Sequence, residues 1–148
     1  MKNLFDKTVI EELSARITAL DPNQQPQWGQ MGVAQMLAHC SEVLKNALGD
    51  GQQKRMWIGY VVAPFIRHRY YDNQPFKKKN VPSSFIVNTN KDFVEERQKL
   101  ISLIEHFYQA GKEKSKHATH PMLGQFMPEQ WAIGQYKHLD HHLRQFGV

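Results

Sequence analysis

Residues 33–48, VAQMLAHCSEVLKNAL, decide the fold of this chain, because their apolar side chains recur every three or four positions. That spacing places them on one face of an α-helix, which must be buried against other elements. Gly32 is an acceptable N-cap, and Gly49-Asp50-Gly51 provides a clear stop. The predicted buried face consists of Val33, Met36, Leu37, Cys40, Val43, Leu44 and Ala47.

The same periodicity continues on both sides of this helix, whereas strand signals are weak. The phrase FIV at 85–87 is too short to build a sheet, and residues 71–90 suit an ordered loop. Four long amphipathic helices with one additional helical segment predict an all-α four-helix bundle, with residues 1–148 as a single domain. The other expected helices are residues 6–20, 54–70, 91–110 and 128–146.

Local signals set the expected ends of these helices. Pro64 should kink or divide the 54–70 segment. Thr89 or Asn90 is the expected N-cap of the next helix, which Gly111 should end. Met127, or the residue beside it, should cap the last helix.

Composition excludes several classes of protein. Of 148 residues, 41% are apolar, enough for a core, but no apolar run reaches the roughly 18 residues of a membrane span. The net charge of +5 is modest, and the lysine run at 77–79 fits a solvated loop. We therefore predict no membrane and no nucleic-acid partner; DNA association is a third hypothesis, for which the residues themselves offer only this charge. Without a signal-peptide core, and with Cys40 as its single cysteine, the chain is expected in the cytoplasm.

The last helix carries three histidines within five positions, in YKHLDHHLRQF at 136–146. His138 and His142 are four residues apart, so both imidazoles lie on one helical face, a spacing that suits two nitrogens on one metal ion. His141 lies about 100° round the helix from His142, at the edge of such a site. The inward stripe that contains the pair is Trp131, Gln135, His138, His142 and Gln145.

A third ligand must come from another helix, and His39 is the best candidate. It lies in the apolar phrase MLAHCSE, where a buried imidazole needs a partner. Three histidine ligands leave a coordination position for water or substrate, as in catalytic sites. The alternative is that His39 is a hydrogen-bonded core residue and that the i,i+4 pair arose by chance.

Three phrases carry a resemblance to a known family: WGQMGVAQMLAHCSE near the start, HPMLGQFMPEQW, and QYKHLDHHLRQFGV at the end. Together they resemble the DinB/YfiT-like superfamily of metalloenzymes, specifically an uncharacterised and mainly bacterial branch. The resemblance covers nearly the whole chain. It implies a four-helix bundle with an up-down-down-up connection order, and a divalent ion such as Zn or Ni on His39, His138 and His142. It also implies a possible homodimer.

The resemblance implies two kinds of activity, thiol S-transfer with a low-molecular-weight thiol and metal-dependent hydrolysis, and the sequence does not choose between them. A non-catalytic protein that binds metal or a small ligand is the alternative. Glu42, His120 and His141 are the candidates for a further catalytic role. Glu42 follows His39 by three residues, and the loop carrying His120 leads directly into the last helix.

Overall fold

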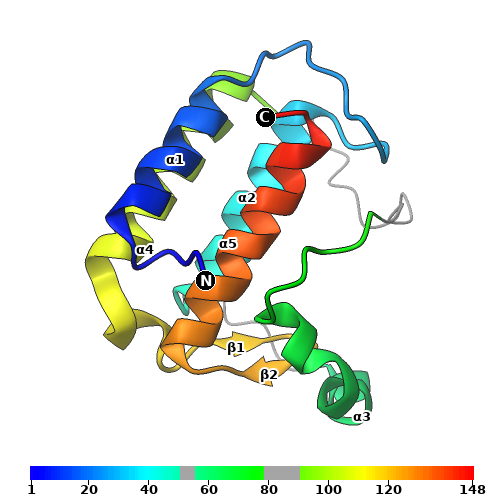
Figure 1. The fold of residues 1–148 in the computed structure, drawn as a ribbon, viewed down its shortest axis with the longest axis vertical. Helices are drawn as coiled ribbons and strands as arrows, with labels where there is room; N and C mark the ends of the chain where they lie inside the picture. Colours follow the sequence, from blue (N-terminus) through cyan, green and yellow to red (C-terminus); the bar gives the residue numbers. More distant parts are fainter. Residues whose placement is uncertain (51–55, 79–90) are drawn as a thin grey trace.

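The computed structural model describes residues 1–50, 56–78 and 91–148 of the chain. It is mostly helical, with one antiparallel pair of short strands (Figure 1). Within these residues no helix is both long and apolar enough to cross a membrane. The elements are α1 Lys7–Thr18, α2 Val33–Ala47, α3 Trp57–Ile66, the 3₁₀ helix η1 Arg67–Tyr70, α4 Phe93–Ser115, β1 Thr119–His120, β2 Gly124–Gln125 and α5 Pro128–Gln145.

Helix α2 follows its sequence prediction closely. Gly32 is its N-cap, and the Gly32 backbone N–H donates to the side chain of Gln35 at 2.9 Å. The helix ends before Gly49, whose φ of 77° is a left-handed conformation that favours glycine. Every predicted inward residue except Val43 is fully buried. The apolar spacing of this segment therefore predicted both its conformation and its buried face.

Helices α1 and α5 also form where the sequence placed them. Asp6 caps α1 by accepting a hydrogen bond from the Thr8 backbone N–H at 3.0 Å. Met127 is the N-cap of α5, as predicted, and its backbone N–H donates to the side chain of Gln130 at 3.0 Å. Pro128 occupies the first turn, where its missing N–H costs no hydrogen bond.

The 54–70 segment is divided into two helices, one of the two predicted outcomes, but the division does not fall at Pro64. Pro64 lies inside α3 without ending it, and the division falls at Ile66, where the chain tightens into η1. Pro64 is the eighth residue of a ten-residue helix, so its ring disturbs only the last turns. The predicted residues 54 and 55 lie outside the described residues.

Helix α4 differs from its prediction at both ends. Its N-cap is Asp92, whose carboxylate accepts from the Glu95 backbone N–H at 2.8 Å. Thr89 and Asn90 lie outside the described residues, as do residues 85–87 and most of the predicted 71–90 loop. Gly111 breaks the helix, as expected, with φ 63°, but helical structure resumes and continues to Ser115.

The connector between α4 and α5 contains a small hairpin that the sequence did not indicate. Thr119 pairs with Gln125 and His120 with Gly124. The His120 Nδ1 atom closes the turn, because it accepts from the backbone N–H groups of Met122 and Leu123, each at 3.1 Å. A side chain acting as a turn acceptor has no periodic signature, so sequence patterns missed it.

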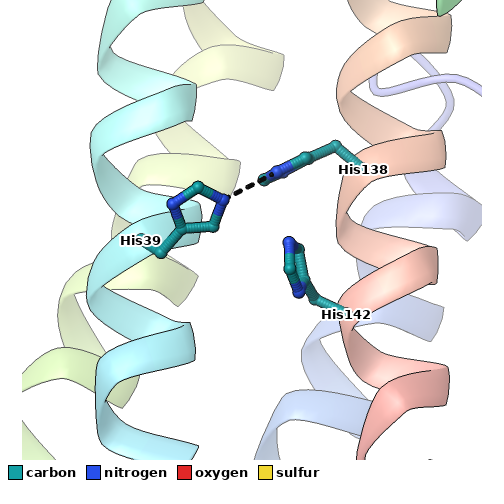
Figure 2. A group of neighbouring side chains, drawn as sticks. All are labelled: His39, His138 and His142. Carbon is teal, nitrogen blue, oxygen red and sulfur yellow. Dashed lines mark hydrogen bonds between the residues drawn. The ribbon is translucent and has the colours of Figure 1, made fainter. Parts of the chain in front are cut away.

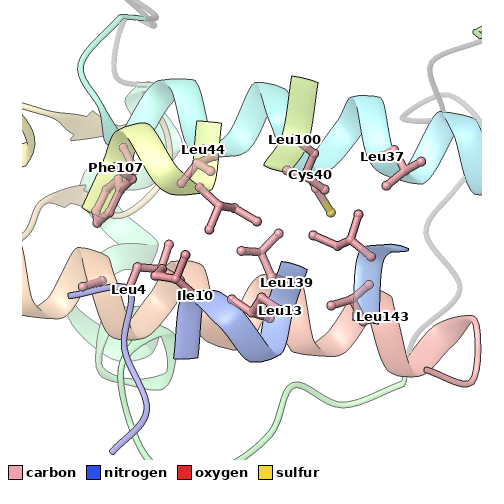
Figure 3. Close-up of a cluster of buried hydrophobic side chains, with 14 of the residues drawn as sticks. Leu4, Ile10, Leu13, Leu37, Cys40, Leu44, Leu100, Phe107, Leu139 and Leu143 are labelled. Carbon is pink, nitrogen blue, oxygen red and sulfur yellow. The ribbon is translucent and has the colours of Figure 1, made fainter. Parts of the chain in front are cut away.

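The apolar faces of four helices share one core (Figure 3). Helix α2 packs against α4 and α5, and α1 packs against the same two helices. Arg16 of α1 adds a polar tie to α5, since its Nη1 contacts Asp140 Oδ1 at 2.9 Å and its Nη2 donates to the Val148 carbonyl at 2.9 Å. The fully buried residues of this core include Leu13, Ile17, Met36, Leu37, Leu44, Leu100, Ile104, Phe107, Trp131 and Phe146.

Candidate metal centre

The packing of α2 against α5 brings the three predicted histidines together (Figure 2). His39 projects from α2 toward α5, and His138 and His142 project toward it from successive turns of α5. One ligand nitrogen of each residue lies within 4.8 Å of the others. The three histidines are therefore close enough to hold one metal ion.

The ring geometry of this cluster is compatible with shared coordination. His39 Nε2 and His138 Nε2 are 3.1 Å apart. Two nitrogens at about 2.0–2.1 Å from one tetrahedral ion would be separated by about 3.3 Å. The ring centroid of His142 lies 5.0 Å from that of His39 and 4.7 Å from that of His138. The donor set therefore fits a divalent ion such as zinc.

Burial keeps these imidazoles uncharged. It lowers the pKa of His39, and it lowers the pKa of His142 to about 4. The pKa of His138 falls well below the usual value, first because of burial and then because His142 and His39 repel a positive charge there. Metal ligation requires neutral imidazole, so burial prepares the ligands at neutral pH.

Gln145 fixes the orientation of His142. Its Nε2 donates to the Trp28 carbonyl at 2.7 Å, which leaves its Oε1 facing His142 Nδ1 at 2.9 Å. An amide oxygen can only accept, so the Nδ1 atom of His142 carries the proton and Nε2 carries the lone pair. Hydrogen bonds of this kind orient metal-binding histidines in many proteins. The inward stripe in the sequence contained Gln145, but its role depends on a carbonyl 117 residues away.

His138 has a different environment. Its buried Nδ1 has no hydrogen-bond partner within the described part of the chain. Gln135, one turn earlier, donates from Nε2 to Tyr70 Oη at 2.9 Å, while its buried Oε1 has no partner among those residues. A hydrogen bond between His39 Nε2 and His138 Nε2, which are 3.1 Å apart, requires one of the two rings to carry its proton on Nε2, whereas a metal ion bound by both Nε2 atoms requires both rings to carry it on Nδ1.

His141 lies beside the cluster, at the edge that its position on the helix predicts. Its ring contacts His142 with a centroid distance of 5.2 Å, Trp28 at 5.7 Å and Phe76 at 6.1 Å. Two aromatic rings thus contact His141, whose side chain is partly buried. His141 is not part of the group of three close ligand atoms.

His120 also lies outside that group, since its Nδ1 is occupied by the hairpin turn. Its ring stacks on Trp131 with a centroid distance of 6.0 Å and meets Tyr70 edge-on at 5.4 Å. Burial lowers its pKa to about 4. These contacts give His120 a structural role in the hairpin. Its Nε2 is the ring nitrogen that the turn does not use.

Glu42 does not face the histidines. Its side chain is 59% exposed and contacts Lys45 at 2.8 Å and Lys99 at 3.7 Å. The hydrogen bond from Lys45 lowers the pKa of this carboxyl group. The three-residue spacing from His39 predicted that Glu42 would lie near the metal ligands. Its carboxylate instead pairs with Lys45 and Lys99 at the surface, which argues against a general-base role.

Cys40 and Asp140 also lie apart from the cluster. Cys40 is fully buried beside Met36, and burial raises the pKa of its thiol, which matches the predicted inert role. Asp140 pairs with Arg16 and Arg144 and does not orient a histidine. No fourth His, Cys, Asp or Glu of residues 1–50, 56–78 and 91–148 joins the three close ligand atoms.

Comparison with known families identifies one family across nearly the whole chain. Residues 3–147 match the family described as protein of unknown function (DUF1569). No curated protein matches the chain. No solved structure matches it either.

Proposed function

The chain belongs to the DUF1569 family, and we propose that it is a metal-dependent enzyme of the S-transferase or hydrolase kind. One observation carries the proposal: His39, His138 and His142 converge from two helices, with one nitrogen of each within 4.8 Å of the others. Their low pKa values keep them available as ligands, and the described residues add no fourth ligand to close the site.

The protein supplies position and environment to this chemistry. A divalent ion, Zn or Ni, would act as a Lewis acid and lower the pKa of a water or thiol at its open position toward about 7. His39, His138 and His142 would hold it, and Gln145 would fix the donor nitrogen of His142. Trp28 and Phe76 would hold the ring of His141 beside the ion. A low-molecular-weight thiol is the proposed substrate of the transfer reaction.

We further propose that the fold is the DinB-like four-helix bundle with up-down-down-up connections, and that the protein forms a homodimer. The helix directions in Figure 1 support the bundle order: α1 and α5 run from the lower to the upper end, while α2 and α4 run the opposite way. The resemblance of the three sequence phrases to the DinB/YfiT-like superfamily supports the rest.

A non-catalytic protein that binds metal or a small ligand is the second candidate. The 3.1 Å separation of His39 Nε2 and His138 Nε2 favours it, because the same distance is a satisfactory hydrogen bond without metal. A buried pair of this kind can stabilise the contact between α2 and α5 by itself.

The first test is metal content, measured by inductively coupled plasma mass spectrometry on untagged protein. The variant is His138→Ala combined with His142→Ala. The matched control is His106→Ala combined with His117→Ala, because both of these histidines are exposed and removing them leaves the cluster intact. We expect stoichiometric metal in the wild type and the control, and its loss in the cluster variant.

A screen of the metal-loaded protein for thiol transfer and for ester or amide hydrolysis then separates the two candidates. Turnover that disappears in the cluster variant supports the enzyme. Stoichiometric metal without turnover supports the binding protein. Failure to take up Zn or Ni in any form of the protein overturns both metal proposals.

A further inference from the structure

Helix α3 is built with its small residues inward and its large apolar residues outward. Gly59 and Ala63 are its buried positions. The contact at Gly59 is close, since an added Cβ would lie 2.3 Å from the Met122 carbonyl oxygen. The Met56 backbone N–H donates to the Pro121 carbonyl at 2.9 Å. The helix therefore lies on the hairpin connector through its narrow face.

The opposite face of α3 is apolar and open to solvent. Trp57, Val61 and Phe65 are spaced four apart, so they form one stripe, and they are 78%, 63% and 76% exposed. Ile58 and Tyr60 extend it on either side. Contiguous exposed apolar patches of this kind mark interaction surfaces. We name the five residues the α3 face.

The charge next to the α3 face is positive. No Asp or Glu occurs between Met56 and Tyr71, whereas η1 contains Arg67 and Arg69. Arg67 is engaged with the body of the protein, because its Nη2 donates to the Gln125 carbonyl at 2.7 Å. His68 and Arg69 are exposed.

A hollow of about 480 Å³ lies beside Arg69 and His68. Among the described residues that line it, Asp72 is the only acidic one, and Lys137 Nζ neutralises it at 2.6 Å. Arg69 and Lys77 therefore leave the described lining positive. Its size and sign suit a phosphate-bearing group. It is lined by His68, Arg69, Asp72, Gln74, Pro75, Phe76 and Lys77.

We propose that α3 docks on an anionic phospholipid surface, with the α3 face inserted among the headgroups and a lipid phosphate in the adjacent hollow. Aromatic and aliphatic side chains at the boundary, flanked by Lys and Arg, are the pattern of surface-bound helices. Each nearby cation adds about 1 kcal/mol of attraction to an anionic leaflet. The sequence predicted no membrane partner because it contains no membrane-spanning segment. A ten-residue helix that lies on the membrane surface does not require such a segment.

A second copy of the chain suits this face less well. In a two-fold dimer the same surface meets itself, so the α3 faces would bring Arg67 and Arg69 of both copies to one rim. Those like charges would repel each other without an acidic partner between residues 56 and 71. An anionic lipid surface satisfies the apolar stripe and the cations together.

The test is flotation of the full-length protein with two kinds of vesicle, phosphatidylcholine alone and equal parts phosphatidylcholine and phosphatidylglycerol. We expect binding to the anionic vesicles only. Trp57→Ser combined with Phe65→Ser should weaken that binding at least about tenfold. Arg69→Glu combined with Lys77→Glu should abolish it. The control is Val94→Ser in α4, because Val94 is apolar and 50% exposed but lies outside the α3 face. This substitution should leave binding unchanged.

All the substituted side chains are exposed, so the melting temperature should stay the same in every variant and a folding defect would be evident. Two results would overturn the proposal. One is wild-type protein that stays unbound to anionic vesicles. The other is a dimer, seen by analytical ultracentrifugation, that the Trp57→Ser, Phe65→Ser variant dissociates; the α3 face would then join two copies of the chain.

Discussion

Replacing Gln145 by Met tests whether the hydrogen bond to His142 prepares the candidate metal centre. Methionine has nearly the length and volume of glutamine, so the packing around position 145 is largely kept. It can neither accept from His142 Nδ1 nor donate to the Trp28 carbonyl, and both bonds are short, at 2.9 Å and 2.7 Å. The substitution therefore removes the orienting contact and leaves the ligand in place.

The expected effect is a zinc affinity about 10–100-fold weaker, the range found when partners of metal-binding histidines are removed. That range corresponds to about 1.4–2.8 kcal/mol of binding free energy. Loss of the Trp28 contact should also lower the unfolding free energy of the metal-free protein by about 1 kcal/mol. The two effects are measured separately, by competition with a chromophoric chelator and by urea denaturation.

Two further variants make the test specific. Gln109→Met is the control, because Gln109 is an exposed glutamine whose Nε2 donates to Glu105 at 2.8 Å, far from the cluster in sequence. Gln145→Glu keeps an acceptor for His142 Nδ1 while losing the donor to Trp28, so it should retain zinc affinity but not stability. If the zinc affinity of the Met variant is within twofold of wild type, the hydrogen bond to His142 does not prepare the metal centre. Gln145 would then serve only to hydrogen-bond the Trp28 carbonyl.

Two other substitutions and one labelling experiment probe the surroundings of the site. Burial lowers the pKa of His120 to about 4 in the folded protein, against 6.5 in the unfolded chain, so the metal-free protein should lose stability as the pH falls from 6.5 to 4. Urea denaturation at pH 7 and pH 4.5 should show that His120→Asn removes about 1–2 kcal/mol of this loss, after allowing for partial exposure. An unchanged pH dependence would contradict the assignment. Gly134→Ala would place a Cβ 2.0 Å from the Tyr70 ring, so its thermal unfolding should show a loss of about 1–3 kcal/mol, whereas an unchanged melting temperature would place Tyr70 elsewhere. Cys40 should resist iodoacetamide at pH 8 in native protein and react in urea, by mass spectrometry; rapid native labelling would mean that the thiol is not buried.

The helices could be predicted because the signals that form them, apolar spacing and capping residues, lie within each segment. The three- and four-residue spacing in 33–48 and 128–146, with Gly32 and Met127 as caps, predicted α2 and α5 almost to the residue. The same periodicity put His138 and His142 on one face of one helix, since four residues complete about one turn. His39 was selected because a histidine in an apolar helix needs a partner.

The tertiary structure decided which groups meet. The distance from His39 to His138, the contact of Gln145 with Trp28 and the contact of Glu42 with Lys99 each join residues that are distant in the sequence. No local spacing encodes these contacts.

The hairpin and α3 depend on the same kind of information. His120 forms a turn with backbone N–H groups, and Gly59 admits the Met122 carbonyl only because it lacks a side chain. The apolar residues of α3 predicted a helix, but which of them would be buried was set by the surface available to it. The spacing of apolar residues indicates the secondary structure of a segment and which of its faces is apolar. The residues that pack against that face depend on segments that are distant in the sequence.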